Sequence, residues 1–110
     1  MLNRSALIVK KKEPFRQWIN SLPDSDDFTL EELNEDSTVY LLPDYDDDNQ
    51  RDRILKKIYK DIFEEQLESW WLDEKDWPVK RDLRTFKLWF HVEFHSMIVD
   101  LVGTDLIDEE

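Results

Sequence analysis

The amino-acid sequence predicts a two-layer α+β domain, in which a short three-stranded sheet packs against one long central helix and two or three shorter helices. The main observation concerns residues 48–72, where apolar residues fall in adjacent pairs that repeat every four positions, from Ile54-Leu55 to Trp70-Trp71. That spacing is typical of one broad helical face. Short runs of β-branched and aromatic residues before and after this stretch indicate strands.

The chain length sets the domain organisation. With 110 residues, the chain can bury one core but not two. We therefore expect a single domain over residues 1–107, followed by a frayed acidic tail over residues 108–110.

The first predicted elements are a strand and a helix. The apolar run from Ala6 to Val9 indicates a buried strand. Glu13-Pro14 then opens a helix, because proline suits the first helical turn. Apolar residues at helical spacing form its inner face, and Pro23 ends it. These inner residues are Phe15, Trp18, Ile19 and Leu22.

The middle of the chain predicts a short helix, a second strand and the cap of the long helix. Thr29, with Glu32 three residues later, matches a capping box. Residues 38–42 are β-branched and aromatic and are stopped by Pro43. The loop of residues 44–49 places aspartates at the positive end of the long helix, which they cap.

The chain after the long helix is rich in tryptophan. Trp77 is expected to fold back over the helix end, near Trp70-Trp71. Asp82 caps a further helix that continues to about Phe90. An exposed aromatic cluster would be a binding surface, but in a domain of this size we expect most of these rings in the core.

Residues 91–101 leave two alternatives open. Alternation with period two over residues 91–95, followed by the strand-favouring Ile98, indicates a third strand to about Leu101. Apolar residues also fall on one helical face there, so the preceding helix could instead continue to Leu101 and leave a mostly α-helical domain with a two-stranded ribbon. We favour the strand, because two short strands alone make an unstable sheet.

The distribution of charge indicates the kind of partner. The net charge is −12, and the stretch from Asp24 to Asp48 holds eleven acidic residues without a lysine or arginine. Such a field disfavours direct binding to nucleic acid or to anionic membranes and favours a basic protein partner. We therefore interpret the chain as an acidic protein-interaction or regulatory domain. The predicted contact residues are Asp24, Asp26, Asp27, Asp44, Asp46, Asp47 and Asp48.

An alternative function rests on His91, Glu93 and His95. On a strand these three side chains share one face, and a pair of histidines can act as general acid and base. A small metal-dependent or acid/base enzyme of the hydrolase type would use them as catalytic residues, with His91 and His95 as metal ligands. A polar outer face of a half-buried strand has the same pattern, and we favour that simpler interpretation over a catalytic or metal site.

The composition argues against several other classes of protein. The single glycine rules out a glycine-rich phosphate loop, and the absence of cysteine rules out thiolate metal sites, so we expect no cofactor. No run reaches the ~20 apolar residues of a membrane span. We therefore expect a cytoplasmic protein that does not bind membranes and is a monomer or a homodimer.

Several short motifs are spread along the chain, and most of them contain aromatic residues: Leu2–Ala6, Trp70-Trp71, Trp77-Pro78, Trp89-Phe90 and Val92–Met97. Together they resemble a family of small acidic bacterial proteins of about 110 residues with no established function. The resemblance covers nearly the whole chain and implies a bacterial, cytoplasmic, single-domain protein. It implies no catalytic residues.

Overall fold

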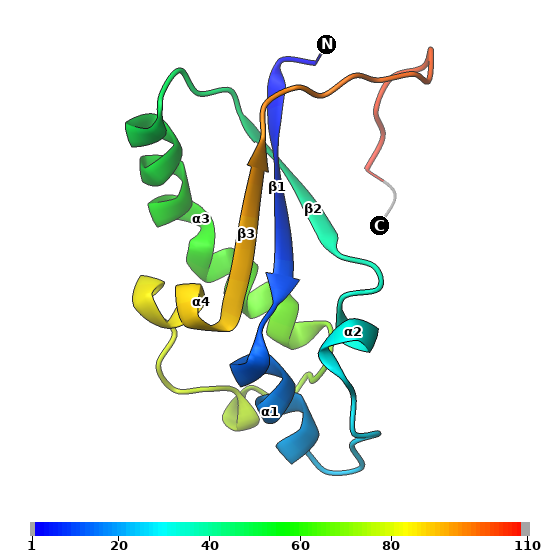
Figure 1. The fold of residues 1–110 in the computed structure, drawn as a ribbon, viewed down its shortest axis with the longest axis vertical. Coiled ribbons are helices and arrows are strands. Elements are labelled where there is room, and N and C mark those ends of the chain that lie inside the picture. Colours follow the sequence, from blue (N-terminus) through cyan, green and yellow to red (C-terminus); the bar gives the residue numbers. More distant parts are fainter. Residues whose placement is uncertain (1, 109–110) are drawn as a thin grey trace.

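The computed structural model describes residues 2–108 and shows a two-layer α+β domain, with a three-stranded sheet in one layer and helices in the other (Figure 1). The predicted fold class is therefore confirmed. The mostly α-helical alternative is wrong, because a third strand is present. The elements are β1 (Arg4–Lys11), α1 (Glu13–Ser21), α2 (Leu30–Leu33), β2 (Thr38–Pro43), α3 (Asp48–Glu68), the 3-10 helix η1 (Glu74–Asp76), α4 (Leu83–Trp89) and β3 (Phe90–His95).

The sheet is antiparallel throughout and has the order β2-β1-β3, so β1 is the central strand. Leu7 of β1 pairs with Tyr40 of β2 and with Phe94 of β3. Since side chains alternate along a strand, these three residues share the face that turns toward α3. Leu7 is completely buried there.

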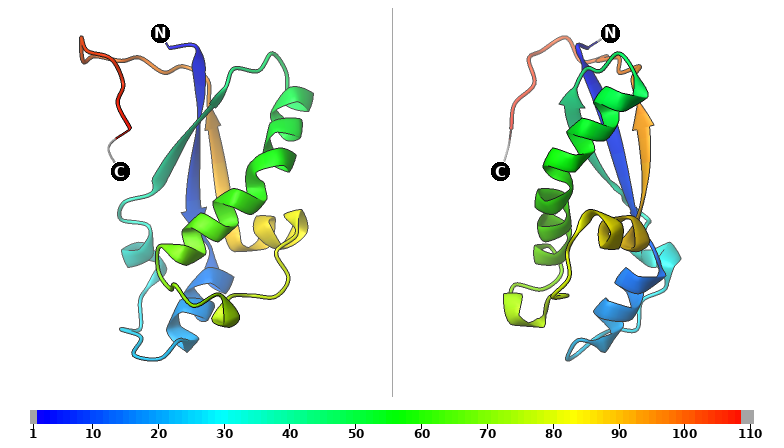
Figure 2. Two further views of the ribbon diagram at one scale, coloured as in Figure 1. Left: turned by 180° about the vertical axis from the view of Figure 1, so that it is seen from behind. Right: turned by 90° about the vertical axis from the view of Figure 1, so that its left-hand side faces the viewer.

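Helix α3 crosses this inner face diagonally, from β3 to β2. It lies behind the sheet in Figure 1 and in front of it when the molecule is turned round in Figure 2. Near its start, the Arg51 guanidinium lies 5.0 Å from the centre of the Phe94 ring. Near its end, the side-chain amide of Gln66 donates to Thr38 Oγ1 at 3.0 Å and to the Tyr40 hydroxyl at 2.9 Å.

The core lies where α3 meets α4 and the sheet. Phe63 of α3 is completely buried, and its ring centre lies 6.1 Å from that of Phe86 and 5.3 Å from that of Phe90. Ile62 and Leu67 are also buried. The apolar ladder repeating every four residues therefore does form one buried helical face, as the sequence predicts.

The long helix is shorter than predicted at its C-terminal end. It ends at Glu68, whereas the apolar pattern extends to Leu72. Trp70 and Trp71 lie in the turn that follows, and both backbone N–H groups donate to the Leu67 carbonyl. Both rings still contact the rest of the protein, and the apolar pattern in the sequence therefore extends past the end of the helix.

The third strand is also shorter than predicted. It ends at His95 rather than near Leu101, because the chain beyond the Ala6–His95 pair leaves the β1 ladder, although β1 itself begins two residues earlier, at Arg4. Residues 96–108 form neither helix nor strand. Of the predicted frayed tail, Asp108 is exposed and residues 109–110 lie outside the described part of the chain.

We predict that Phe63→Ala lowers the free energy of unfolding by about 3–5 kcal/mol, because it removes a buried ring and leaves a cavity between α3, α4 and β3. Urea unfolding followed by tryptophan fluorescence measures this loss. Leu88→Ala is the matched control, since Leu88 is 58% exposed on α4, and it is expected to change stability by less than about 0.5 kcal/mol. Equal effects of the two substitutions would contradict this description of the core.

Candidate functional site

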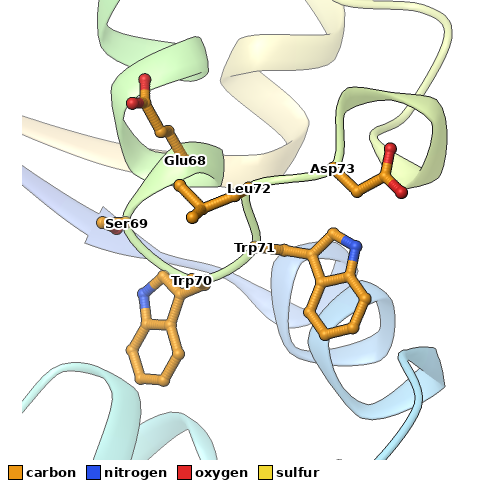
Figure 3. A pocket seen from close by; sticks show the side chains of 6 residues that line it. All are labelled: Glu68, Ser69, Trp70, Trp71, Leu72 and Asp73. Carbon is orange, nitrogen blue, oxygen red and sulfur yellow. The ribbon is translucent and has the colours of Figure 1, made fainter.

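A group of aromatic and aliphatic side chains, two of them exposed, follows the end of α3 and consists of Trp70, Trp71 and Leu72 (Figure 3). Trp70 is 36% exposed and Leu72 is 79% exposed. Trp71, which comes between them in the sequence, is half-buried. Large apolar side chains that remain exposed beside one another often mark a contact surface.

Trp71 is held in place by the chain that follows it. Its indole N–H donates to Asp76 Oδ2 at 3.0 Å, and its carbonyl accepts from the Trp77 indole at 2.8 Å. The predicted return of Trp77 over the helix end is therefore confirmed. Trp77 itself is buried and belongs to the core.

Trp70 is packed on its inner side and open on its outer side. Its ring meets that of Phe28 edge to face at 5.2 Å, and the Lys11 ammonium lies 5.8 Å from its centre. The same ammonium lies 5.4 Å from the Phe15 ring, and burial lowers the pKa of Lys11. Among the described residues, the Trp70 indole N–H has no hydrogen-bond acceptor, so it is available to a bound molecule.

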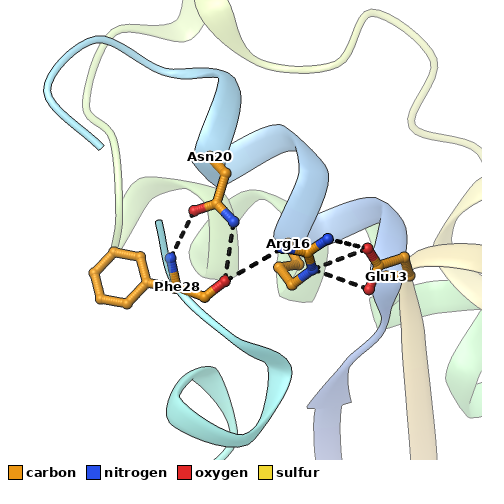
Figure 4. Close-up of polar contacts among 4 residues, drawn as sticks. All are labelled: Glu13, Arg16, Asn20 and Phe28. Atoms are coloured by element: carbon orange, nitrogen blue, oxygen red, sulfur yellow. Dashed lines mark hydrogen bonds and ion pairs between the residues drawn. The ribbon is translucent and has the colours of Figure 1, made fainter. Parts of the chain in front are cut away.

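The acidic loop between α1 and α2 is fixed beside Trp70 by Asn20 (Figure 4). The Asn20 amide accepts from the Phe28 N–H and donates to the Phe28 carbonyl, both at 2.9 Å. Arg16 donates to the same carbonyl at 3.5 Å. Within this loop Asp24 and Asp27 have φ values of 61° and 56°, a left-handed conformation that aspartate adopts more readily than most residues.

Carboxylates surround the two tryptophans. One hollow beside them is lined by Glu68, Leu72 and Asp73, and a second is lined by Asp24, Asp26 and Phe28. Trp70 and Trp71 line both hollows, so the two form one continuous surface. We define the acidic tryptophan surface as Trp70, Trp71 and Leu72 together with Asp24, Asp26, Glu65, Glu68 and Asp73.

The charges at the end of α3 are arranged unfavourably for the helix itself. The C-terminus of a helix carries a partial negative charge, which nearby cations stabilise. The last turn of α3 contains no basic residue and carries Glu65 and Glu68. From Asp61 to Asp76 the only base among seven acids is Lys75, whose ammonium is 3.3 Å from Asp73. The surface therefore presents a concentrated negative field.

Glu65 is positioned by a hydrogen-bond chain from the sheet. The Tyr40 hydroxyl donates to Glu65 Oε1 at 2.9 Å and accepts from the Gln66 amide. Burial of the phenol, together with the neighbouring Glu65 carboxylate, raises the pKa of Tyr40 to about 12. This chain ties the last turn of α3 to β2.

The predicted contact aspartates lie in two separate places. Asp24, Asp26 and Asp27 are in the loop between α1 and α2, at the lower end of the molecule in Figure 1, and Asp24 and Asp26 line a hollow together with the two tryptophans. The group of residues 44–48 follows β2 at the opposite, upper end, where Asp47 caps α3 by accepting from the Gln50 N–H. The two groups therefore do not form one surface.

His91, Glu93 and His95 do share the outer face of β3, as expected for a strand. The Glu93 carboxylate lies between the histidines, 3.7 Å from Nε2 of each, and 3.2 Å from the Lys10 ammonium. Its hydrogen bond with Lys10 holds the pKa of Glu93 below its usual value. These residues line none of the hollows described above. Within residues 2–108, no group of three or more histidine, aspartate or glutamate side chains is arranged to hold a metal ion.

Comparison with protein families, with curated proteins and with solved structures finds no match for this chain. The resemblance to a family of small acidic bacterial proteins therefore stays a prediction. In the part of the chain that the structure describes, no helix has both the length and the apolar character needed to cross a bilayer.

We predict that Glu68→Gln raises the free energy of unfolding by about 0.3–1 kcal/mol, because it removes a negative charge from the negative end of α3. Thermal unfolding at low salt measures the change. Asp48→Asn is the matched substitution at the positive end of the same helix and is expected to lower stability. The same direction of change in both variants would contradict the helix-dipole explanation.

We predict that one tyrosine titrates with a midpoint near pH 12 in the folded protein. The ordinary pKa of a tyrosine is 10.0, and that of Tyr40 is raised to about 12, so the folded state favours its protonated form. The resulting stabilisation is complete below pH 10 and is lost as the pH rises through 12. Ultraviolet titration measures this midpoint. Persistence of the same component in Tyr40→Phe would contradict the assignment.

Proposed function

We propose that this small α+β domain is a protein-interaction module that binds a basic, amphipathic protein segment at the acidic tryptophan surface. The single observation that carries the proposal is the half-exposed Trp70, which stands between two hollows that are both lined by carboxylates. A partner with one apolar and one basic side complements such a surface.

The aromatic centre supports a specific contact rather than a diffuse ionic one. Tryptophans are enriched among the few residues that dominate binding energy, especially where polar groups surround them and exclude water. Trp70 offers an open ring edge and a free indole N–H, and Leu72 adds an exposed aliphatic side chain. Both lie in a turn whose position is fixed by the bonds of Trp71.

The charges explain why the partner would be basic. The acidic tryptophan surface contains five carboxylates and no lysine or arginine, and the negative end of α3 adds to their field. Lysine or arginine side chains of a partner would relieve the repulsion around Glu68. Such attraction steers association and weakens as salt screens it.

A module of this kind regulates by covering a basic surface of another protein. The proposal places the contact at the lower end of the molecule and includes Asp24 and Asp26 of the predicted contact residues. It gives no role in this contact to residues 44–48, which lie at the other end.

A synthetic amphipathic helix of leucine and lysine tests this function by titration calorimetry. We expect binding that Trp70→Ala weakens by about 30-fold or more, as for a central contact residue. Affinity is also expected to fall steeply between about 50 and 500 mM salt.

A matched pair of acidic variants distinguishes the surface from net charge alone. Replacing Asp24 and Asp26 by asparagine is expected to weaken binding, whereas replacing Asp44 and Asp46 by asparagine removes the same charge at the other end and has a small effect. Equal losses in the two double variants would show that only the overall charge matters and would contradict the proposed site.

A further inference from the structure

The segment that follows β3 has the composition of a strand but pairs with no strand within residues 2–108. Met97, Val99 and Leu101 alternate along it and are 79%, 61% and 92% exposed. Val102, Leu106 and Ile107 are exposed as well. In Figure 1 this segment leaves the upper end of β3, passes the N-terminus and turns away from the sheet.

The chain itself offers this segment little backbone pairing. One hydrogen bond, from the Leu2 N–H to the Ile98 carbonyl at 2.7 Å, continues the contact between β1 and β3 beyond His95. Past this point β1 has ended, while the outer edge of β3 is unpaired because the sheet order is β2-β1-β3. An exposed strand-like segment beside an open sheet edge is a template for pairing with another chain.

We propose that the partner of this segment is a second copy of the same chain, and that residues 96–102 of the two copies pair as antiparallel strands about a two-fold axis at Val99. A two-fold contact uses the same surface on both copies, so each residue meets a fixed counterpart. In this register Val99 meets Val99, and Met97 meets Leu101 of the other copy. The alternating exposed residues therefore all face apolar partners.

The same register continues along β3, where it brings one apolar pair and one pair of like charges together. Asp100 lies opposite Ile98 rather than opposite its own copy. Residues 103–108 of one copy run along the free edge of β3 of the other, which places Leu106 opposite Val92. Asp105 then faces Glu93, a pair of like charges that opposes pairing and that the Lys10 ammonium, 3.2 Å from the Glu93 carboxylate, offsets in part.

The surface available suits a weak dimer. Each large apolar side chain contributes roughly 60–120 Å² on burial, so the six exposed in each copy represent roughly 700–1,400 Å² in a dimer. Specific, stable interfaces begin near ~1,200 Å², so we expect a weak dimer that forms only at micromolar concentrations or above. Each copy carries a net charge of −12, so added salt strengthens this dimer, whereas it weakens binding of a basic partner.

Sedimentation velocity of the full chain, from about 1 to 500 μM, tests the dimer across its expected affinity. We expect a shift from monomer to dimer that Val99→Asp weakens at least about tenfold, because two carboxylates would then face each other. Val79→Asp is the matched control, since Val79 is 97% exposed and lies outside the segment. A chain that stays monomeric, or equal effects of the two substitutions, would overturn the proposal.

The register has its own test, because the chain contains no cysteine. Opposed residues of antiparallel strands have Cα atoms about 4.5–5.5 Å apart, which suits a disulfide. Under mild oxidation at high concentration, Val99→Cys is expected to form a covalent dimer much faster than Val79→Cys. Similar rates for the two variants would refute pairing centred on Val99. The acidic tryptophan surface takes no part in either experiment. If the proposed function failed its own test, the expected outcomes of these two experiments would therefore be unchanged.

Discussion

The packing of α3 across the sheet is the constraint on which the rest of the structure depends. The helix is bound to β3 through Arg51 and Phe94 at one end and to β2 through Gln66 at the other. Its apolar face closes the core between the two layers. Because its course is fixed at both ends, the position of the turn after Glu68 is fixed as well. The placement of Trp70, and of Glu68 and Asp73 on either side of it in the sequence, follows from this one contact.

The elements of the fold were largely predictable because they depend on local patterns. The four-residue ladder of α3, the Thr29 capping box and the Asp82 cap each appear where the sequence indicates them. The two errors in length have a common cause. Apolar composition predicts that a residue is buried or strand-like, but the end of a helix or strand depends on tertiary partners. Trp71 has such partners beyond the helix, whereas among the described residues the segment after His95 keeps one backbone hydrogen bond to the chain before β1, from Leu2 to Ile98.

The candidate site was only partly predictable. The acidic stretch from Asp24 to Asp48 is continuous in sequence, yet β2 runs the length of the sheet between its two loops and separates them in space. Acidic residues that are close in the sequence are therefore divided by the fold. Glu65, Glu68 and Asp73 of the candidate site were not predicted. The sequence did contain a signal for them. The last turn of α3 contains acidic residues and no basic one, which destabilises the helix and therefore indicates a role other than stability.

The side-chain amide of Asn20 occupies the place of a peptide group in a strand pair, donating to and accepting from the same residue of the loop. The loop is thus held by side-chain hydrogen bonds and contains neither glycine nor cysteine. A recognition surface that is already in its bound shape loses little conformational entropy when it associates. Encounter with an oppositely charged protein would then proceed at a rate governed by diffusion and long-range attraction, with no slow ordering step before the complex closes.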